Sequence, residues 1–225
     1  MGNLSLKSFI IKSVTVCALA LSVASLLIPA SAHAATLITD GSFETPAVAN
    51  ILTISAGQTS IAPWVVNAGS VDVINQNSTF NTGPAFDGNQ FLDLDGNNAG
   101  TITQAFSTVP SALYYITFAY GNNYAANHGP SSSATVQLFD GSGSLLLQTI
   151  THSTSVNGNL HWTPFSGQFT AVQNTTSLQF ASLDAANSNG GIYLDGIAVT
   201  ASPEPTSAAL LGLGALLLAA RRRQV

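Results

Sequence analysis

Hydrophobic and polar residues alternate with a period of two through much of the middle of the chain. One segment places four large side chains on the same face: Tyr114, Ile116, Phe118 and Tyr120. The segment 135–139 has the same alternation. This spacing is typical of half-buried β-strands, because successive side chains of a strand point to opposite faces. No segment of this section has the 3.6-residue period of a long amphipathic helix.

Short apolar runs separated by turn residues predict further strands. Asp140-Gly141-Ser142-Gly143 lies between 135–139 and the run 145–150, which predicts a β-hairpin. The other predicted strands are 70–74, 90–95, 101–106, 167–171, 177–183 and 192–200. Many short strands joined by Gly-, Asn- and Ser-rich turns predict an all-β antiparallel sandwich of the jelly-roll type. On the strand 90–95, Asp93 and Asp95 would share the solvent-facing side.

The N-terminal end of the chain has the pattern of an export signal. Two lysines precede the apolar run 14–28, and small residues surround a cleavage position between Ala34 and Ala35. This order is typical of a secretory signal peptide, which signal peptidase removes. A permanent membrane anchor is the alternative, although the run is shorter than the ~20 apolar residues of a spanning helix. We therefore expect a signal helix over 1–34 and a sandwich domain over 35–201.

The C-terminal end, 202–225, combines three features. Pro203, Glu204 and Pro205 are followed by an apolar run over 208–220 and then by three arginines. This combination resembles the PEP-CTERM sorting signal of bacterial exported proteins. The resemblance implies a hydrophobic helix that enters the inner membrane transiently, and an exosortase-type enzyme that recognises and cuts the tail. The alternative is a short tail anchor that stays in the membrane.

The distribution of charge excludes several functions. Residues 35–202 contain nine carboxylates and no Lys or Arg, which gives this section a net charge of minus nine with His neutral. Binding to a nucleic acid backbone needs cationic side chains, so nucleic acid is excluded as a main partner. The only cysteine, Cys17, lies in the predicted signal segment. A processed chain would therefore have neither a disulfide nor a thiolate nucleophile.

Four blocks of the middle section, in order along the chain, resemble one family. They are 37–46 (LITDGSFETP), 61–64 with 69–74, 87–96 with 100–106, and 191–197. The family is known as domain of unknown function 642, and its bacterial relatives are labelled choice-of-anchor C. The resemblance implies a galactose-binding-like jelly roll, an association with cell-wall or matrix polysaccharide, and no established enzyme activity. The chain departs from the family pattern at Asp40, where Asn is usual, and at Gly196, where a second Asp is usual.

Two acidic residues of these blocks are candidates for a metal site. Glu44 directly follows Phe43, whose ring we expect in the core, so the Glu44 carboxylate is partly desolvated and needs a partner. The first and last strands of such sandwiches are commonly neighbours, which would bring Glu44 near Asp195. Two carboxylates with backbone carbonyls form the oxygen cage that Ca2+ prefers, so a structural Ca2+ there is one hypothesis. The favoured alternative is a hydrogen-bonded Glu44 that caps a turn.

A polar loop with one aromatic residue is the candidate ligand site. Its candidate ligand-binding residues are Tyr124, Asn122, Asn123 and Asn127. Sugar-binding sites combine a flat aromatic ring with hydrogen-bonding side groups, so the composition of this loop favours carbohydrate. Trp162 is a further ligand-binding candidate, but the favoured interpretation places its ring in the core. Trp64 is expected in the core.

Together these features predict an exported, non-catalytic protein of the cell surface or extracellular matrix that binds polysaccharide. The second hypothesis is a purely structural surface protein without a specific ligand. A glycan-active hydrolase is less favoured, because 35–201 has no G-x-S-x-G frame for a serine nucleophile. A glycosidase would rest on Asp93 and Asp95 as its carboxylate pair.

Overall fold

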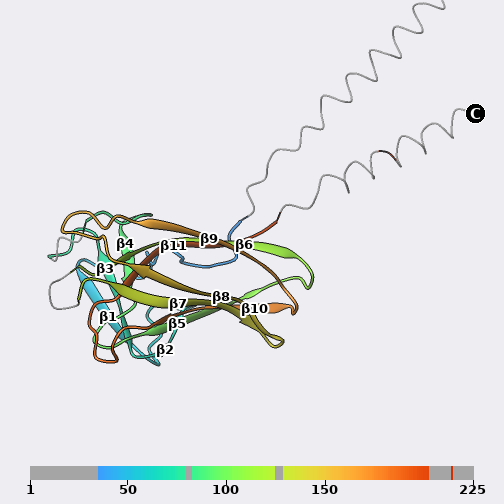
Figure 1. Cartoon of the computed structure of the whole chain (residues 1–225), viewed down its shortest axis with the longest axis horizontal. Coiled ribbons are helices and arrows are strands. Elements are labelled where there is room, and N and C mark those ends of the chain that lie inside the picture. Colours follow the sequence, from blue (N-terminus) through green and yellow to red (C-terminus); the bar gives the residue numbers. More distant parts are fainter. Residues whose placement is uncertain (1–34, 80–82, 125–128, 203–213, 215–225) are drawn as a thin grey trace, which may run out of the picture. The chain divides into compact units, whose positions relative to one another are not determined.

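The computed structural model describes residues 35–79, 83–124, 129–202 and 214 (Figure 1). The predicted signal helix, the tripeptide from Pro203 to Pro205 and Asn127 lie outside these residues. Within the described ranges, no helix is long and apolar enough to cross a membrane. The strands are β1 (Ile51–Ser55), β2 (Val65–Ala68), β3 (Ser70–Asn75), β4 (Gln90–Asp93), β5 (Thr101–Ser107), β6 (Leu113–Asn122), β7 (Ser132–Asp140), β8 (Gly143–His152), β9 (Thr163–Thr170), β10 (Thr175–Ser182) and β11 (Ile192–Ala201).

The strands form two sheets that pack face to face (Figure 1). The first sheet has six strands in the order β1-β3-β4-β11-β6-β9, and the second has five in the order β2-β5-β10-β7-β8. Every pair of neighbouring strands is antiparallel. Many neighbours, such as β4 and β11, are far apart in sequence, as in a jelly roll. The predicted all-β antiparallel sandwich is confirmed, and so is the hairpin between β7 and β8.

Three strands differ from the sequence prediction. The pattern does not predict β1 and β2, which have only five and four residues. The strand expected over 167–171 is β9, which already begins at Thr163 and includes Pro164. Because β9 pairs only with β6 and is therefore an edge strand, it tolerates a residue that donates no backbone N–H.

The prediction that Asp93 and Asp95 face solvent is wrong. Asp93 is 1% exposed and Asp95 is 0% exposed. On β4, Asp93 lies on the same face as Phe91, and this outer face of the six-stranded sheet is covered by residues from distant loops, among them Leu160 and Trp162. Asp95 lies beyond the end of the strand, where the chain turns inward.

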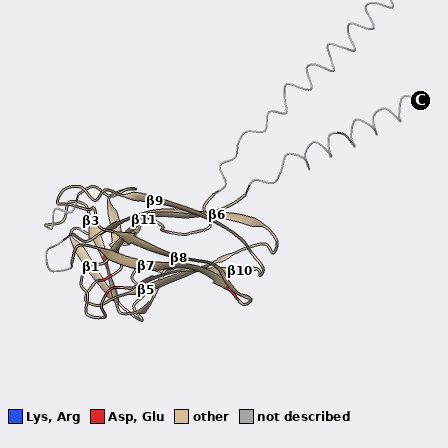
Figure 2. Ribbon diagram, viewed as in Figure 1, with Lys and Arg blue, Asp and Glu red and all other residues tan. Residues whose placement is uncertain are grey.

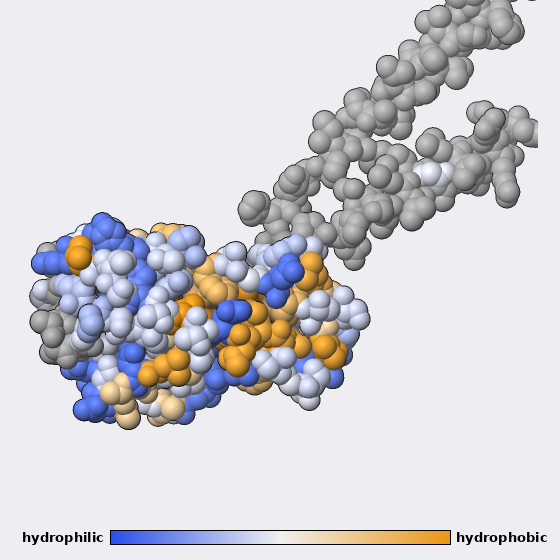
Figure 3. All heavy atoms as spheres, in the orientation of Figure 1, coloured by the Kyte–Doolittle hydropathy of each residue, from blue (hydrophilic) through white to orange (hydrophobic). Residues whose placement is uncertain are grey.

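The main core fills the space between the two sheets. Phe43 and Trp64 are 0% and 1% exposed, which confirms both as core residues. Their ring centroids are 5.7 Å apart, and the Trp64 ring lies 6.3 Å from that of Phe180 on β10. Each such ring stabilises the fold by roughly 2–3 kcal/mol through burial of apolar surface. Hydrophobic residues also gather on the surface, over the middle of the face in Figure 3. Large hydrophobic side chains that are exposed in the described part of the chain include Leu147 and Phe86.

The first described segment runs beside the last strand, although it is not itself a strand. The expectation that the first and last strands are neighbours is wrong, because β1 pairs with β3 and two strands separate it from β11. Leu37 donates its N–H to the carbonyl of Val199 at 2.7 Å, and Ile197 donates to the carbonyl of Gly41 at 3.0 Å. A side chain at Gly41 would collide with the Ile197 carbonyl, so only glycine permits this close approach. The register of β11 against β6 shifts just before this contact, between Asp195 and Ala198.

Candidate functional site

Asp195 is a buried carboxylate that holds a loop in place. Its Oδ2 accepts the backbone N–H groups of Phe86 at 2.8 Å and Asp87 at 2.9 Å. Its Oδ1 accepts the N–H of Gly196 at 2.6 Å. Burial raises the pKa of Asp195 to about 7, and the three backbone donors counteract part of this increase, to which the nearby charge of Asp87 adds. Asp195 therefore fixes the position of the segment that carries Phe86.

Glu44 holds the other end of the same loop. Its Oε1 accepts the backbone N–H groups of Asn89 at 2.7 Å and Gln90 at 2.8 Å. The Glu44 carboxylate also occupies the space where a side chain at Gly88 would lie. Gly88 has a φ of +73°, so the turn requires glycine for its backbone conformation as well.

The predicted calcium site can be compared with these contacts. Glu44 and Asp195 bind opposite ends of one loop, and both oxygens of Asp195 already accept N–H groups. Within the described residues, no group of three or more His, Cys, Asp or Glu side chains is arranged to hold a metal ion. The two carboxylates are therefore better arranged to anchor the loop than to coordinate a cation. A calcium ion at Glu44 and Asp195 stays a prediction.

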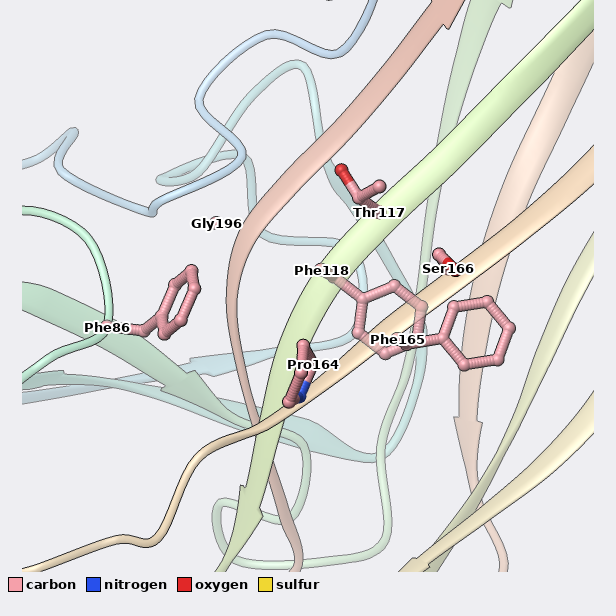
Figure 4. A pocket seen from close by; sticks show the side chains of 7 residues that line it. All are labelled: Phe86, Thr117, Phe118, Pro164, Phe165, Ser166 and Gly196. Carbon is pink, nitrogen blue, oxygen red and sulfur yellow. The ribbon is translucent and has the colours of Figure 1, made fainter.

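The loop and the neighbouring sheet enclose a surface pocket of about 350 Å3. Its lining residues come from the loop and from β6, β9 and β11: Phe86, Thr117, Phe118, Pro164, Phe165, Ser166 and Gly196 (Figure 4). We call this the aromatic pocket. Two of its walls are the hydroxyl-bearing Thr117 and Ser166, which are register partners on β6 and β9 and are both exposed.

Phe86 is the most accessible aromatic ring of the aromatic pocket. It is 53% exposed, and Figure 4 shows it reaching from its loop toward Gly196. Gly196 has a φ of +60°, and a Cβ there would lie only 3.0 Å from Cδ1 of Phe86. The glycine thus makes room for the ring and also adopts the left-handed conformation that other residues avoid. Gly196 is one of the two positions at which the sequence departs from the family pattern.

Aromatic contacts extend the site on both sides of Phe86. Phe165 is half-buried and stacks on Phe118, with centroids 4.5 Å apart. The predicted ligand residue Trp162 lies on the other side, and its ring makes edge contacts with Phe86 at 6.4 Å and with Phe91 at 5.6 Å. Trp162 is half-buried and donates its indole N–H to the carbonyl of Pro84 at 3.0 Å.

The predicted ligand loop is largely integrated into the fold. Asn122 is 1% exposed, and its Oδ1 contacts His152 Nδ1 at 2.7 Å. Asn123 is half-buried and donates its side-chain amide to Asp93 Oδ2 at 3.2 Å. Tyr124 is half-buried, packs against the cluster that contains Phe91, and donates its hydroxyl to an oxygen of the Asn157 side chain at 3.3 Å. These residues border the face that carries Trp162 but do not line the aromatic pocket.

The sequence analysis missed most residues of the aromatic pocket. One signal was present, because Phe86 is an aromatic residue within the Gly-, Pro- and Asn-rich stretch 83–89, where a hydrophobic ring has no core to enter. Thr117, Ser166 and Gly196 carry no such signal. They meet only because β9 and β11 both pair with β6.

Comparisons with known proteins place the chain in a family. No curated protein matches its sequence. Among solved structures it is similar to TmCBM61 in complex with beta-1,4-galactotriose, with 12% identity and a TM-score of 0.47 over 74% of this chain and 99% of that one. It is also similar to Family 16 Carbohydrate Binding Module-2, with 17% identity and a TM-score of 0.47 over 73% and 99% of the two chains. The family model "Protein of unknown function (DUF642)" matches residues 36–200, and the chain therefore belongs to this family.

Proposed function

We propose that this domain binds a neutral polysaccharide without cleaving it, at the cell surface or in the extracellular matrix. The observation that carries the proposal is the exposed ring of Phe86, which Asp195 and Gly196 hold at the mouth of the aromatic pocket. A fixed aromatic ring beside an apolar pocket suits the apolar face of a pyranose ring. The hydroxyls of Thr117 and Ser166 supply hydrogen-bonding partners for the sugar.

The charge of the domain favours neutral polymers. The described residues carry Asp and Glu but no Lys or Arg (Figure 2). A polyanionic chain such as a uronic acid polymer would be repelled by this surface and would find no cationic side chain to pair with. A neutral polysaccharide has no such penalty, since its recognition depends on stacking and hydrogen bonds.

The absence of acidic residues from the aromatic pocket favours binding over catalysis. None of the seven lining residues is Asp or Glu. Glycoside hydrolysis commonly requires two carboxyl groups on either side of the scissile bond. Asp195 and Glu44 accept backbone N–H groups of the loop, and Asp87 on the loop accepts the hydroxyl of Ser42, so these three carboxylates support the loop.

The proposal includes export. A signal peptide cleaved between Ala34 and Ala35 would deliver the domain across the inner membrane, and the tail with Pro203, Glu204 and Pro205 would present it to an exosortase-type enzyme. Signal peptidase and this sorting enzyme would be transient partners. The polysaccharide would be the lasting one.

Binding of the full-length chain, purified in a mild detergent, to a panel of neutral and uronate polysaccharides tests the proposal. We expect saturable binding to at least one neutral polymer, and a loss of about five- to thirtyfold in affinity for Phe86→Ala, because stacking on one ring contributes roughly 1–2 kcal/mol. The control is Val109→Ala, since Val109 is 64% exposed and does not line the pocket. It should bind like the unmodified chain.

Three outcomes would contradict the proposal. Binding to none of the polymers would favour the purely structural alternative. Unchanged affinity in Phe86→Ala, with an unchanged melting temperature, would move the site away from the aromatic pocket. Release of reducing sugar from a bound polymer would show that the domain is a hydrolase.

A further inference from the structure

A second acidic site lies apart from the aromatic pocket, in the loop after β4. Asp95 is 0% exposed, and neither of its carboxylate oxygens has a hydrogen-bond partner within the described residues. The carboxylate lies directly against the backbone of Gly191, where a Cβ would be 2.6 Å from its Cγ. A buried carboxylate without donors is strongly unfavourable unless something neutralises it.

Asp184 brings a second carboxylate to the same site. Its Oδ1 accepts the N–H of Ser133 at 3.0 Å, whereas its Oδ2 is buried without a hydrogen-bond partner in the described part of the chain. The backbone ties the two regions together, because Ser182 donates its N–H to Gly100 at 2.9 Å and Gly100 donates to Leu94 at 2.9 Å. The charge of Asp184 raises the pKa of Asp95, in addition to the larger effect of burial.

Serine hydroxyls complete the surroundings of the two carboxylates. The hydroxyl of Ser132, a residue only 1% exposed, has no hydrogen-bond partner in the described ranges. The hydroxyls of Ser182 and Ser188 lie close enough to favour the charged form of Asp95, but neither meets the geometry of a hydrogen bond to it. The site therefore brings together oxygen atoms that can accept hydrogen bonds or coordinate a cation. The sequence supplies no Lys or Arg between residues 13 and 220 that could neutralise them.

We propose that Asp95 and Asp184, together with the hydroxyls of Ser132, Ser182 and Ser188, bind a hard divalent cation of the Ca2+ type. Calcium takes six to eight oxygen ligands in flexible geometry, and it accepts carboxylates, neutral oxygens and water together. The cation would connect the loop after β4, the loop after β10 and the start of β7. This site is separate from Glu44 and Asp195, and it does not depend on polysaccharide binding.

Thermal unfolding of the full-length chain in a mild detergent, with either EDTA or CaCl2, tests the proposal. We expect CaCl2 to raise the melting temperature by about 5 °C, because a ligand that binds only the folded state stabilises it. In Asp95→Asn this shift should disappear, and the melting temperature in EDTA should equal or exceed that of the unmodified chain, since the substitution removes an uncompensated charge. Asp184→Asn should also lose the shift.

Two controls locate the effect. Asp140→Asn changes a half-buried aspartate at the hairpin between β7 and β8, whose carboxylate accepts N–H groups of Ser142 and Gln173, and should keep the full calcium shift. Calorimetric titration with CaCl2 should show that Glu44→Gln retains one calcium ion that Asp95→Asn has lost. The proposal is overturned if CaCl2 leaves the unmodified chain unchanged, as it would if Asp95 were simply protonated. It is also overturned if Asp95→Asn retains the shift, or if Glu44→Gln alone abolishes it.

Discussion

Asp195 and Asp95 are both fully buried aspartates in a domain without basic side chains, yet their surroundings differ. Asp195 accepts three backbone N–H groups, which come from Phe86, Asp87 and Gly196. Asp95 has no aligned donor within the described residues. The comparison shows that the backbone can replace a basic residue where a loop turns its N–H groups inward. Where it does not, the carboxylate needs a partner from outside the chain.

The two regions therefore have different consequences for function. The bonds of Asp195 fix a loop and, with it, the exposed ring of Phe86. A hydrogen bond contributes roughly 1 kcal/mol to stability, so three of them together are enough to hold a short loop in one conformation. The oxygen atoms at Asp95 that have no hydrogen-bond partner in the described residues do not hold the adjoining loops in place by themselves. They would hold the adjoining loops together only after a cation has bound.

The largest expected effect is on the pH dependence of stability. Burial raises the pKa of Asp195 from 3.8 to about 7, so the folded chain holds a proton that the unfolded chain has released. The stability is therefore fully present below about pH 4 and falls as the pH rises through 7, by roughly 4 kcal/mol for this group. We expect Asp195→Asn to remove the part of this pH-dependent loss of stability that Asp195 causes. Urea unfolding at a series of pH values in EDTA measures it.

Asp95→Asn sharpens the same comparison. The pKa of Asp95 is also raised by burial, so this variant should flatten the pH profile in EDTA as well. In CaCl2, the profile of the unmodified chain should flatten without any substitution, because a bound cation favours the charged form of Asp95.

If the profile of Asp195→Asn ran parallel to that of the unmodified chain, Asp195 would not be the buried titrating group described here.

Much of the fold could be predicted from the sequence, because strand alternation and turn residues act locally. Phe43 and Trp64 are predicted core residues because both are large hydrophobic residues within the blocks that resemble the family. The burial of Asp93 could not be predicted, since residues that contact its carboxylate, Asn123 and Gly191, are distant in sequence. A local pattern shows which residues share a face, but not whether another segment covers that face.

The candidate site was less predictable than the fold. The sequence analysis singles out Glu44 as a partly desolvated carboxylate that needs a partner and Asp195 as its expected neighbour. The donors that both carboxylates accept from belong to a loop whose path depends on the whole sandwich. The amide of Asn122 follows the expected sugar-binding composition, yet it is buried and contacts His152. Composition predicts the chemistry a loop can offer, whereas packing decides which groups remain accessible.

A smaller effect is expected from Gly191→Ala, which tests how closely Asp95 is packed. The added methyl group would lie 2.6 Å from the Asp95 Cγ, so the carboxylate or the backbone must move. Forcing atoms into a packed site commonly costs about 2 kcal/mol. The control is Gly141→Ala, where a Cβ meets nothing within 4 Å, and its stability should change by less than about 0.5 kcal/mol. Urea unfolding gives both values.

A double-mutant cycle makes the Gly191 test specific. Asp95→Ala removes the group that the new methyl would meet, so the combined variant should recover about 1 kcal/mol relative to the sum of the two single changes. Simple additivity would mean that the methyl group at position 191 clashes with something other than Asp95.

The smallest effect is expected for Glu44→Gln, which changes a carboxylate that, like Asp195, accepts backbone N–H groups. Glutamine retains an oxygen that can accept the N–H groups of Asn89 and Gln90, so the loop keeps its anchor and loses only the charge on it. A charge-assisted hydrogen bond is roughly twice as strong as a neutral one, which predicts a loss of about 1 kcal/mol in urea unfolding. Glu44→Ala, which removes the acceptor, should cost more and should expose the amides of Asn89 and Gln90 to faster hydrogen exchange. Equal stability of the two variants would mean that the loop is held by Asp195 alone.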